Sequence, residues 1–283
     1  VTSAEARKRQ QGSKGEGDAV PAAVRPEMSG PLADYILLHR HAAAQASLAT
    51  SPAIALRLMV AHAMAGSALW DVRPFELRAR KDETQASVES GVSVAALAEA
   101  TAQTDALFKA LNVSPALRRN GDDYRLCELF SALLAMSDGE VLQVLATVMA
   151  RTLETGNGIV EAVLHVCGTD LSAAWKPDEA FFDLTKDKRA INAMIGDIAT
   201  LSLAESCRAE TGKAQKHVLA NRIKGEGCEA NPDWRPGWMQ VPPTRLVDGA
   251  GSPPADAWTR IASLFEAGAE NASDETPEHQ DAA

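Results

Sequence analysis

The sequence predicts a mainly α-helical protein, a multi-helix globular bundle with an extended strap rich in Pro and Trp and with disordered termini. Hydrophobic residues make up 46% of the 283-residue chain, but aromatic residues make up only 5%. Ala and unbranched side chains are abundant, and these lose little conformational entropy in a helix. Apolar residues recur at helical spacing, and no alternating run of strand length is present.

Composition divides the chain into four parts. Residues 1–30 are rich in Gly, Lys, Gln, Ser and Pro and have few large apolar side chains, which predicts a disordered linker. Residues 31–246 are expected to form the helical body. A terminal amphipathic helix is expected over 247–268, and 269–283 reads as an acidic disordered tail.

The first half of the body shows helix starts and one interruption. Helices are expected to begin near Pro31 and after Ser51, which is a good N-cap. Residues 70–91 are polar and irregular, and we expect a loop or edge segment there. Ser137 and Glu140 have the spacing of a capping box and predict a helix start. Further helices are expected over 93–111, 123–136, 137–156 and 159–168.

The second half contains the strap. The elements expected before it are a short helix ending at Trp175, a restart at Pro177, one long helix over 188–207, and a short basic helix that ends near Gly225. Residues 229–246 hold four prolines and two tryptophans, which predicts an extended segment. We expect Trp234 and Trp238 to hold this strap against the helical body.

Charge and hydropathy narrow the class of protein. The net charge is −10, and residues 247–283 carry eight acidic side chains and one basic one. An acidic body is a poor electrostatic match for a DNA backbone. The sequence has no run of 18 apolar residues and no secretory signal, so we expect a cytoplasmic protein with no membrane partner. The first residue is Val, which indicates a translated fragment or a start at an alternative codon, and in either case something upstream could be missing.

The sequence predicts no metal site and no cofactor. His39 and His41 are two residues apart, which on a helix points them about 200° apart, so one ion cannot bind both. We expect packed histidines, or histidines that contact a partner. The cysteines have no paired spacing typical of zinc ligands, which favours reduced, partly buried thiols. They are Cys127, Cys167, Cys207 and Cys228.

No complete catalytic motif is present, and we expect a protein that is not an enzyme. The segments GSKGEG at 12–17 and TGK at 211–213 lack the spacing of a phosphate-binding loop. A nucleophile elbow is absent too. One catalytic alternative stays open: a metal-dependent nuclease would need clustered carboxylates, and Asp183, Asp187 and Asp197 are the candidates.

Two features are candidates for DNA binding. Ala135, Gly139 and Leu145 lie near the spacing of a helix-turn-helix, but the second helix is apolar nearly all round, which is typical of core. The other feature is a basic segment over 186–224, which could contact phosphates or could be a solvated helix face. Its residues are Lys186, Lys188, Arg189, Lys213, Lys216, Arg222 and Lys224.

Three segments resemble the C-terminal region of plasmid- and prophage-type ParB partition proteins. They are YILLHRHAA at 35–43 with SPAIALRLMVAHAM at 51–64, LHVCGTDLSAAWKPDEAFFDLTKDK at 164–188, and WRPGWMQVPP at 234–243. The last is similar to the family's W-x-P-x-W-M-x-F-P-P segment, with Val241 where an aromatic residue is more usual. The resemblance spans about 31–246 and is loose over 70–125.

The resemblance implies a DNA-partition role in plasmid or chromosome segregation, beside a Walker-type partner ATPase. Family members carry an N-terminal ParB domain with a phosphate-binding motif, and residues 1–30 do not match it. No catalytic or nucleotide-binding residue carries over. We therefore expect a C-terminal helical module that binds partners or self-associates, with an autonomous DNA-binding protein that uses residues 186–224 as the alternative.

Overall fold

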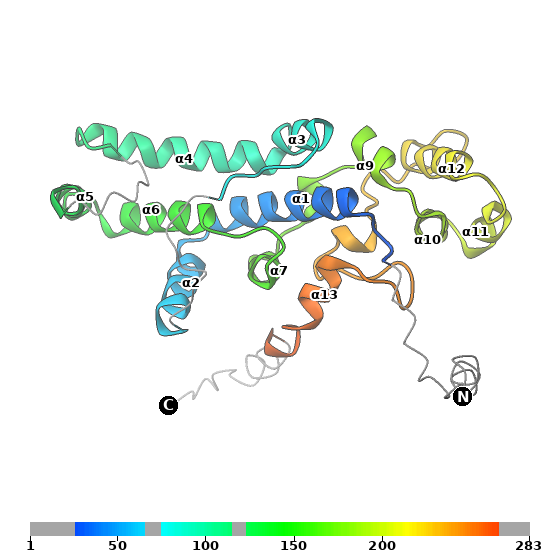
Figure 1. Cartoon of the computed structure of the whole chain (residues 1–283). Coiled ribbons are helices and arrows are strands. Elements are labelled where there is room, and N and C mark those ends of the chain that lie inside the picture. The colour runs from blue at the N-terminus through cyan, green and yellow to red at the C-terminus, as the bar shows by residue number, and fades with distance from the viewer. Residues whose placement is uncertain (1–25, 66–74, 115–122, 266–283) are drawn as a thin grey trace, which may run out of the picture.

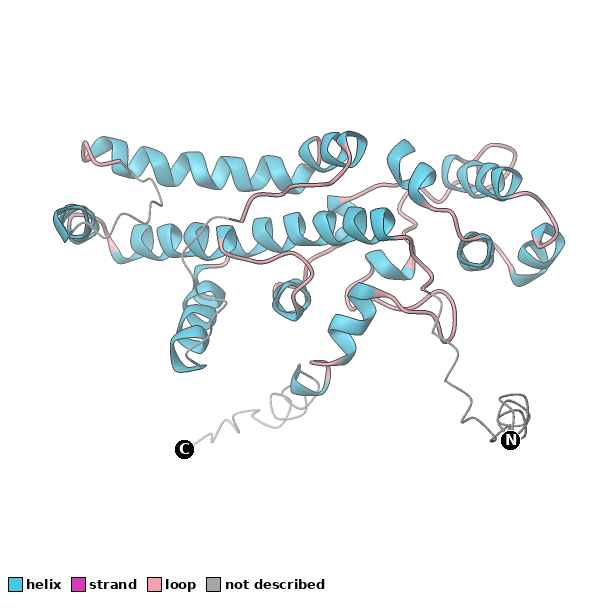
Figure 2. Ribbon diagram, viewed as in Figure 1, coloured by secondary structure: helices cyan, strands magenta, loops and turns pink. Residues whose placement is uncertain are grey.

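The computed structural model describes residues 26–65, 75–114 and 123–265, and within these ranges the chain is mostly helical and has no strand (Figures 1 and 2). The prediction of a mainly α fold is therefore confirmed. The helices are α1 (Gly30–Ala49), α2 (Pro52–Ala65), α3 (Asp82–Glu89), α4 (Val92–Ala110), α5 (Asp123–Leu134), α6 (Asp138–Arg151), α7 (Gly158–Val166), α8 (Leu171–Ala174), α9 (Glu179–Leu184), α10 (Lys188–Ile198), α11 (Leu201–Cys207), α12 (Gly212–Lys224), the 3-10 helix η1 (Gly237–Met239) and α13 (Pro253–Thr259).

Helix α1 is the centre of the fold. It contacts α2, α3, α4, α6, α7, α8, α9, α13 and η1. Figure 1 shows α4 running beside α1 and α6, with α5 at one end of the molecule and α10, α11 and α12 at the other. Because neighbours surround α1, its buried residues include charged and polar side chains as well as apolar ones. The Ser29 hydroxyl caps the helix by accepting from the Leu32 amide at 3.4 Å.

Two hydrophobic clusters stabilise the described part of the chain. The larger one joins α1, α6, α7, α9, α10 and the strap, with Trp238, Phe181 and Met194 among its fully buried side chains. The smaller one lies between α4, α5 and α6, where Phe108, Ala132 and Val144 pack together. The smaller cluster contains few fully buried residues, so the end of the molecule at α5 has the thinner core.

The prediction of a loop over 70–91 is wrong for its second half, which forms α3. Asp82 and Glu83 lie in the first turn, where the helix dipole favours acidic side chains. Thr84 and Val88, four residues apart, are buried on one face. The helix is mostly polar, so it forms because that narrow face packs against α1, α4 and α9.

The single long helix expected over 188–207 is also wrong, because the chain divides it into α10 and α11. Ala199 leaves the helical conformation, with φ −129° and ψ −94°. The Thr200 hydroxyl then accepts from the Leu203 amide at 3.2 Å and caps α11. The apolar spacing continues through the break, which is why periodicity alone predicts one helix. The basic helix α12 ends as expected at Gly225, in the left-handed conformation with φ 81°.

The bounds of the two terminal parts of the chain differ from those predicted from the sequence. The linker expected over 1–30 extends too far, because Glu27 and Met28 are buried in the body; residues 1–25 lie outside the described structure. The terminal helix expected over 247–268 is shorter, because α13 ends at Thr259. It packs against α7 and α1 as part of the same body. The tail predicted at 269–283 lies outside the described residues.

The strap follows α12 and crosses the body with little regular structure. Between residues 226 and 252 it contains turns and the short helix η1. A methyl group on Gly237 would overlap the hydroxyl and carbonyl oxygens of Thr244, so glycine is required where the strap folds back on itself. In the part of the chain that the structure describes, none of the helices has the length and apolarity to cross a membrane.

Candidate functional site

Two of the segments that carry the family resemblance, 35–43 and 234–243, meet in the interior around one arginine. Arg40 on α1 is completely buried, and its partner Glu161 on α7 is 2% exposed. The Arg40 Nε lies 2.8 Å from Glu161 Oε1 and 3.0 Å from Oε2, and Nη2 also donates to Oε2. A buried charge is costly unless it is paired and hydrogen-bonded, and this pair meets both conditions.

The same guanidinium holds the strap. Arg40 Nη1 donates to the carbonyl oxygens of Trp238 and Gln240, each at 2.8 Å. The Trp238 indole N–H donates to Glu27 Oε1 at 2.6 Å. Glu27 Oε2 accepts from the Leu246 and Val247 amides at 3.2 and 2.9 Å. The strap therefore depends on side chains of the body, because its own backbone forms few of these bonds.

A second polar network joins α1, α3 and the segment before α9. The Tyr35 hydroxyl donates to Asp178 Oδ1 at 2.7 Å, and Ser87 Oγ donates to Asp178 Oδ2 at 2.5 Å. The Trp175 indole donates to Tyr35 at 3.1 Å. Burial, followed by the bond to Asp178, raises the pKa of Tyr35 far above its usual value. Tyr35 is thus a permanent donor.

The two histidines are buried in different directions. His39 Nε2 lies 3.1 Å from Ser87 Oγ, and His41 Nε2 lies 2.6 Å from the Leu153 carbonyl oxygen. Burial lowers the pKa of each from 6.5 to about 4. Their side chains are 8% and 0% exposed, so neither is available to a partner protein, as the sequence had left open.

The tryptophans singled out in the sequence lie in the core with paired indole groups. Trp175, Trp234 and Trp238 are between 0% and 7% exposed. The Trp234 N–H donates to Asp197 Oδ2 at 2.7 Å. These side chains attach the strap and its neighbours to the body, and they present no surface for a partner.

The carboxylates considered for a nuclease are not brought together. Asp197 receives the Trp234 indole, and Asp187 caps α10 by accepting from the Arg189 amide at 2.8 Å. Asp183 lies on α9, at the edge of a surface pocket. Among the described residues, no group of three His, Cys, Asp or Glu side chains could hold a metal ion.

The helix-turn-helix considered around Gly139 has no free recognition helix. Its second helix would be α6, which packs against α1, α2 and α4. Val144, Ala146 and Met149 on α6 are buried. A helix covered by three neighbours cannot enter a DNA groove.

Only some of the basic residues predicted at 186–224 lie close together in the structure. Helices α10 and α12 pack against each other, and a methyl group on Gly212 would lie 3.7 Å from the Lys188 side chain. Burial, and then the charge of Lys186, lowers the pKa of Lys216, whose ammonium donates to the Phe182 carbonyl oxygen. We call Lys186, Lys188, Lys213 and Lys216 the lysine cluster.

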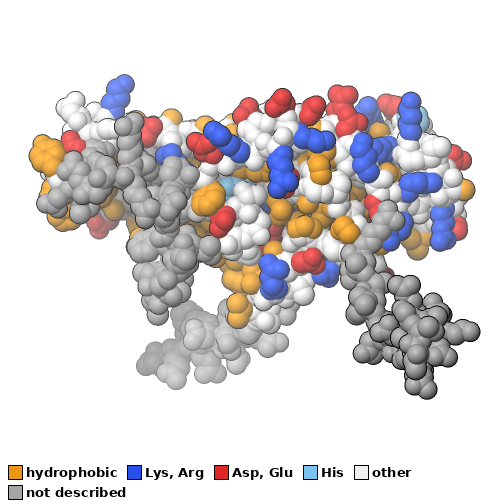
Figure 3. Space-filling view, viewed as in Figure 1, with side chains coloured by type: hydrophobic (Ala, Val, Ile, Leu, Met, Phe, Trp, Pro, Cys, Tyr) orange, Lys and Arg blue, Asp and Glu red, His pale blue; other side chains and the backbone are white. Residues whose placement is uncertain are grey.

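The remaining basic residues differ in orientation. Lys224 is exposed and lies on the same face of α12 as Lys213. Arg222 is half-buried on the opposite face, and Arg189 is paired with Asp187 at 3.0 Å. Figure 3 shows Lys and Arg side chains gathered at the end of the molecule that contains α9, α10 and α12. The acidic residues Asp183 and Asp187 lie nearby in the sequence and reduce the local positive charge.

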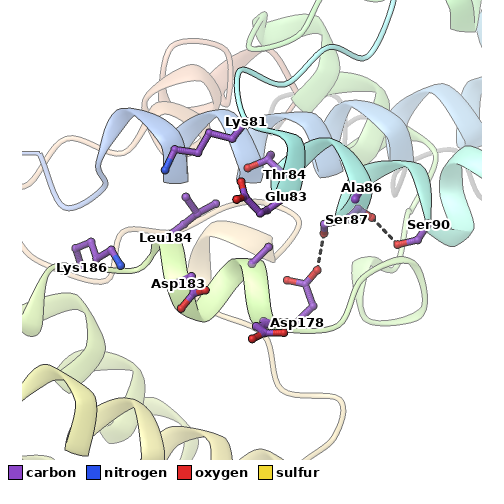
Figure 4. Close-up of a pocket in the computed structure, with 12 residues that line it drawn as sticks. Lys81, Glu83, Thr84, Ala86, Ser87, Ser90, Asp178, Asp183, Leu184 and Lys186 are labelled. Atoms are coloured by element: carbon purple, nitrogen blue, oxygen red, sulfur yellow. Dashed lines mark hydrogen bonds between the residues drawn. The ribbon is translucent and has the colours of Figure 1, made fainter.

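A pocket of about 830 Å³ lies between α3 and α9 (Figure 4). Lys81 and Lys186 line it together with Glu83 and Asp183, so its charge is mixed. Ser87 also lines it and contacts His39 behind it. The carboxylate of Asp178 contacts Ser87 itself, whereas a catalytic triad needs a carboxylate on the second nitrogen of the histidine. This arrangement links helices and does not prepare Ser87 for attack.

Arg40, Glu161 and Glu27 were not among the site residues predicted from the sequence. Arg40 and Glu161 are lone charges within apolar helical runs, and that signal could have identified both as buried partners.

Comparison with known proteins adds no relative: the chain matches no family model, no curated protein and no solved structure.

Replacing Arg40 tests the buried pair. Arg40→Met leaves the Glu161 carboxylate buried without its partner, so we expect the free energy of unfolding to fall by about 3–5 kcal/mol. Adding Glu161→Leu should recover part of this loss, because it removes the isolated charge. Urea unfolding followed by circular dichroism measures both.

Arg80→Met is the matched control for that experiment. Arg80 is 87% exposed and lies 3.4 Å from Asp34, so its loss should cost at most about 1 kcal/mol. An Arg40→Met variant no less stable than Arg80→Met would contradict the structural role of Arg40.

The buried histidines predict a dependence of stability on pH. The unfolded chain binds protons to His39 and His41 near pH 6.5, whereas the folded chain binds them only near pH 4. Stability is therefore complete above pH 6.5 and falls as the pH decreases toward 4, by up to about 3 kcal/mol per histidine. Urea unfolding at several pH values measures the slope.

His41→Gln should flatten that slope between pH 6.5 and 4.5, even if it lowers stability at pH 7. His217→Gln is the control, because His217 lies exposed on α12. A slope unchanged in His41→Gln would show that other groups cause the pH dependence.

Proposed function

We propose that this chain is a non-catalytic helical module of a ParB-like partition protein, and that it acts in plasmid or chromosome segregation by binding other macromolecules. One observation carries the proposal: segment 35–43 binds both of the later segments that resemble that family. Its Arg40 donates to the Trp238 carbonyl oxygen in 234–243, and its Tyr35 binds Trp175 and Asp178 in 164–188.

This observation favours a shared folding unit over a shared reaction. Arg40, Trp175 and Trp238 are buried and bonded within the body, so they would be retained for packing. A catalytic likeness would place several matching polar residues in an accessible pocket. Asp178 lines the surface pocket, but its two oxygens already accept from Tyr35 and Ser87. In this proposal the chain works in the cytoplasm, and its partners are a second copy of itself, a Walker-type partition ATPase and DNA.

The surface we assign to DNA is the lysine cluster together with Lys224. Lys213 and Lys224 are exposed on one face of α12, and α12 contains no acidic residue. Their separation of 11 residues corresponds to about 16 Å along the helix, which spans several phosphates of a DNA strand. The contact is small, so the expected affinity is weak and depends strongly on salt. The second candidate function is autonomous DNA binding through this face.

Reversing the two exposed charges tests the DNA surface. We expect the variant with both Lys213→Glu and Lys224→Glu to bind mixed-sequence duplex DNA about tenfold or more weakly at roughly 50 mM salt, with a salt slope smaller by about 2. Fluorescence anisotropy at roughly 50 and 200 mM salt measures both quantities.

The matched control carries Arg78→Glu and Lys109→Glu, which make the same change in net charge on exposed residues of other elements. Equal weakening in both variants would mean that net charge, and not α12, governs binding. If the unaltered chain binds no DNA at the lower salt, the DNA part of the proposal fails and only protein partners remain.

A further inference from the structure

The pocket between α3 and α9 has the size of a ligand site. Its volume is about 830 Å³, and clefts that bind small molecules have volumes of roughly 300 to 1,000 Å³. Two of the residues that line it, Thr84 and Leu184, are 2% and 7% exposed and belong to the body of the protein. Charged side chains of both helices surround the space (Figure 4). The pocket can therefore hold a small polar molecule.

The two helices run in opposite directions along the pocket, and this separates its charges. Ser87 in the last turn of α3 donates to Asp178, which directly precedes α9, so the end of α3 lies beside the start of α9. Lys81 directly precedes α3, and Lys186 lies two residues after α9. Figure 4 shows these two lysines at one side of the pocket and Ser87 and Asp178 at the other. The pocket thus has a cationic end and an anionic end.

The cationic end has no counter-charge from the protein. Lys81 and Lys186 are both exposed. In the described ranges of the chain, no carboxylate lies within salt-bridge distance of either ammonium group. Two ammonium groups at one end of a pocket attract a carboxylate, and charge-assisted hydrogen bonds to an ionised oxygen are among the stronger ones. This end therefore favours an anionic group of a ligand.

The anionic end has the opposite property. Asp178 is half-buried and accepts from the Tyr35 hydroxyl, the Ser87 hydroxyl and the Phe181 amide. These donors are neutral, so they leave its negative charge uncompensated, and one of the about four acceptor sites of a carboxylate stays open. Glu179 lines the same end and adds a second carboxylate. An ammonium group has three donors and no acceptor, so it fits this end.

The distance between the two ends selects the length of the ligand. Helix α3 has eight residues, which corresponds to about 12 Å along its axis. An extended chain of about three amino-acid residues spans about 10 Å. Glu83 and Asp183 lie between the two ends (Figure 4), and their carboxylates can accept from backbone N–H groups of such a chain. The middle of the pocket therefore favours a peptide over a zwitterion that has no internal donor.

We propose that this pocket binds a short peptide of about three residues with free termini. Its ammonium group binds at Asp178, and its carboxylate binds between Lys81 and Lys186. The inference goes beyond the proposed function and does not rest on it, because the pocket needs neither DNA nor a second protein to be occupied.

Titration of the whole chain with triglycine tests the proposal. Triglycine has both charged termini and no side chains, so it probes the two ends of the pocket alone. A ligand of this size is expected to bind with a Kd of about 1 mM, which chemical shifts of nitrogen-15-labelled backbone amides can measure. We expect the amides of α3 and α9 to shift and to saturate. N-acetyl-triglycine and triglycine amide each lack one charge and should bind about tenfold more weakly.

The variant with both Lys81→Met and Lys186→Met tests the cationic end. It should bind triglycine about tenfold more weakly, but it should bind triglycine amide as the unaltered chain does, because the amide has no carboxylate to lose. The matched control carries Lys109→Met and Lys224→Met, which remove two exposed charges elsewhere, and it should bind triglycine normally. Asp178 is left unaltered because it also caps α9, and N-acetylation of the ligand tests that end instead.

Three outcomes would overturn the proposal. An absence of saturable shifts in α3 and α9 up to about 20 mM triglycine, well above the expected Kd, would exclude the peptide. Equal binding of triglycine and N-acetyl-triglycine would show that Asp178 does not receive an ammonium group. Equal weakening in the two lysine variants would assign the effect to net charge. None of these results bears on DNA binding, so this proposal and the DNA surface can fail separately.

Discussion

The buried guanidinium of Arg40 is the interaction on which the rest of the fold depends. A charge without solvent needs a counter-charge and acceptors for its remaining donors. Glu161 on α7 supplies the first, and the carbonyl oxygens of Trp238 and Gln240 supply the second. One side chain therefore fixes three parts of the chain: the central helix, the helix beneath it and the strap. The strap lacks regular hydrogen bonds of its own, so it requires this external support.

Glu27 has the complementary role at the other side of the strap. Its carboxylate binds the Trp238 indole and the Leu246 and Val247 amides. The strap is thus held by a cation through its carbonyl groups and by an anion through its N–H groups. This arrangement explains why the ordered body begins before Pro31, since Glu27 must be in place for the strap to close.

Much of the fold could be predicted from the sequence, because it depends on local signals. The Ser137–Glu140 capping box and the Gly225 C-cap lie where local rules place them. Helix α3 could not be predicted, because its stability comes from two buried residues that contact distant helices. The same reason applies to the break at Ala199, where a cap overrides an unbroken apolar pattern.

The site was predicted less completely, for a related reason. Trp234 and Trp238 are visible as anchors because large aromatic residues in a proline-rich segment need a core. The partners of Arg40 are 121 and about 200 residues away along the chain, and no local pattern reports such distances. For the basic segment, the sequence predicted more than the fold brings together. Seven basic residues lie close in the sequence, but Arg222 lies on the opposite face of α12 from Lys213, and Arg189 is paired with Asp187.

The proposed DNA surface lies apart from the buried residues that hold the fold together. Lys213 and Lys224 are exposed on α12, at the end of the molecule opposite α5 (Figure 1). Arg40, Glu161 and Trp238 are buried and present no accessible chemistry.

Hydrogen exchange of the strap tests most directly whether Arg40 and Glu27 unite the strap and the body. The Leu246 and Val247 amides and the amides in the middle of α1 should exchange at rates set by the same global unfolding, since the strap opens only when the core does. Fast exchange of the strap amides while α1 stays protected would contradict this account. It would mean that the strap detaches on its own and that the buried network is not the constraint that holds the fold together.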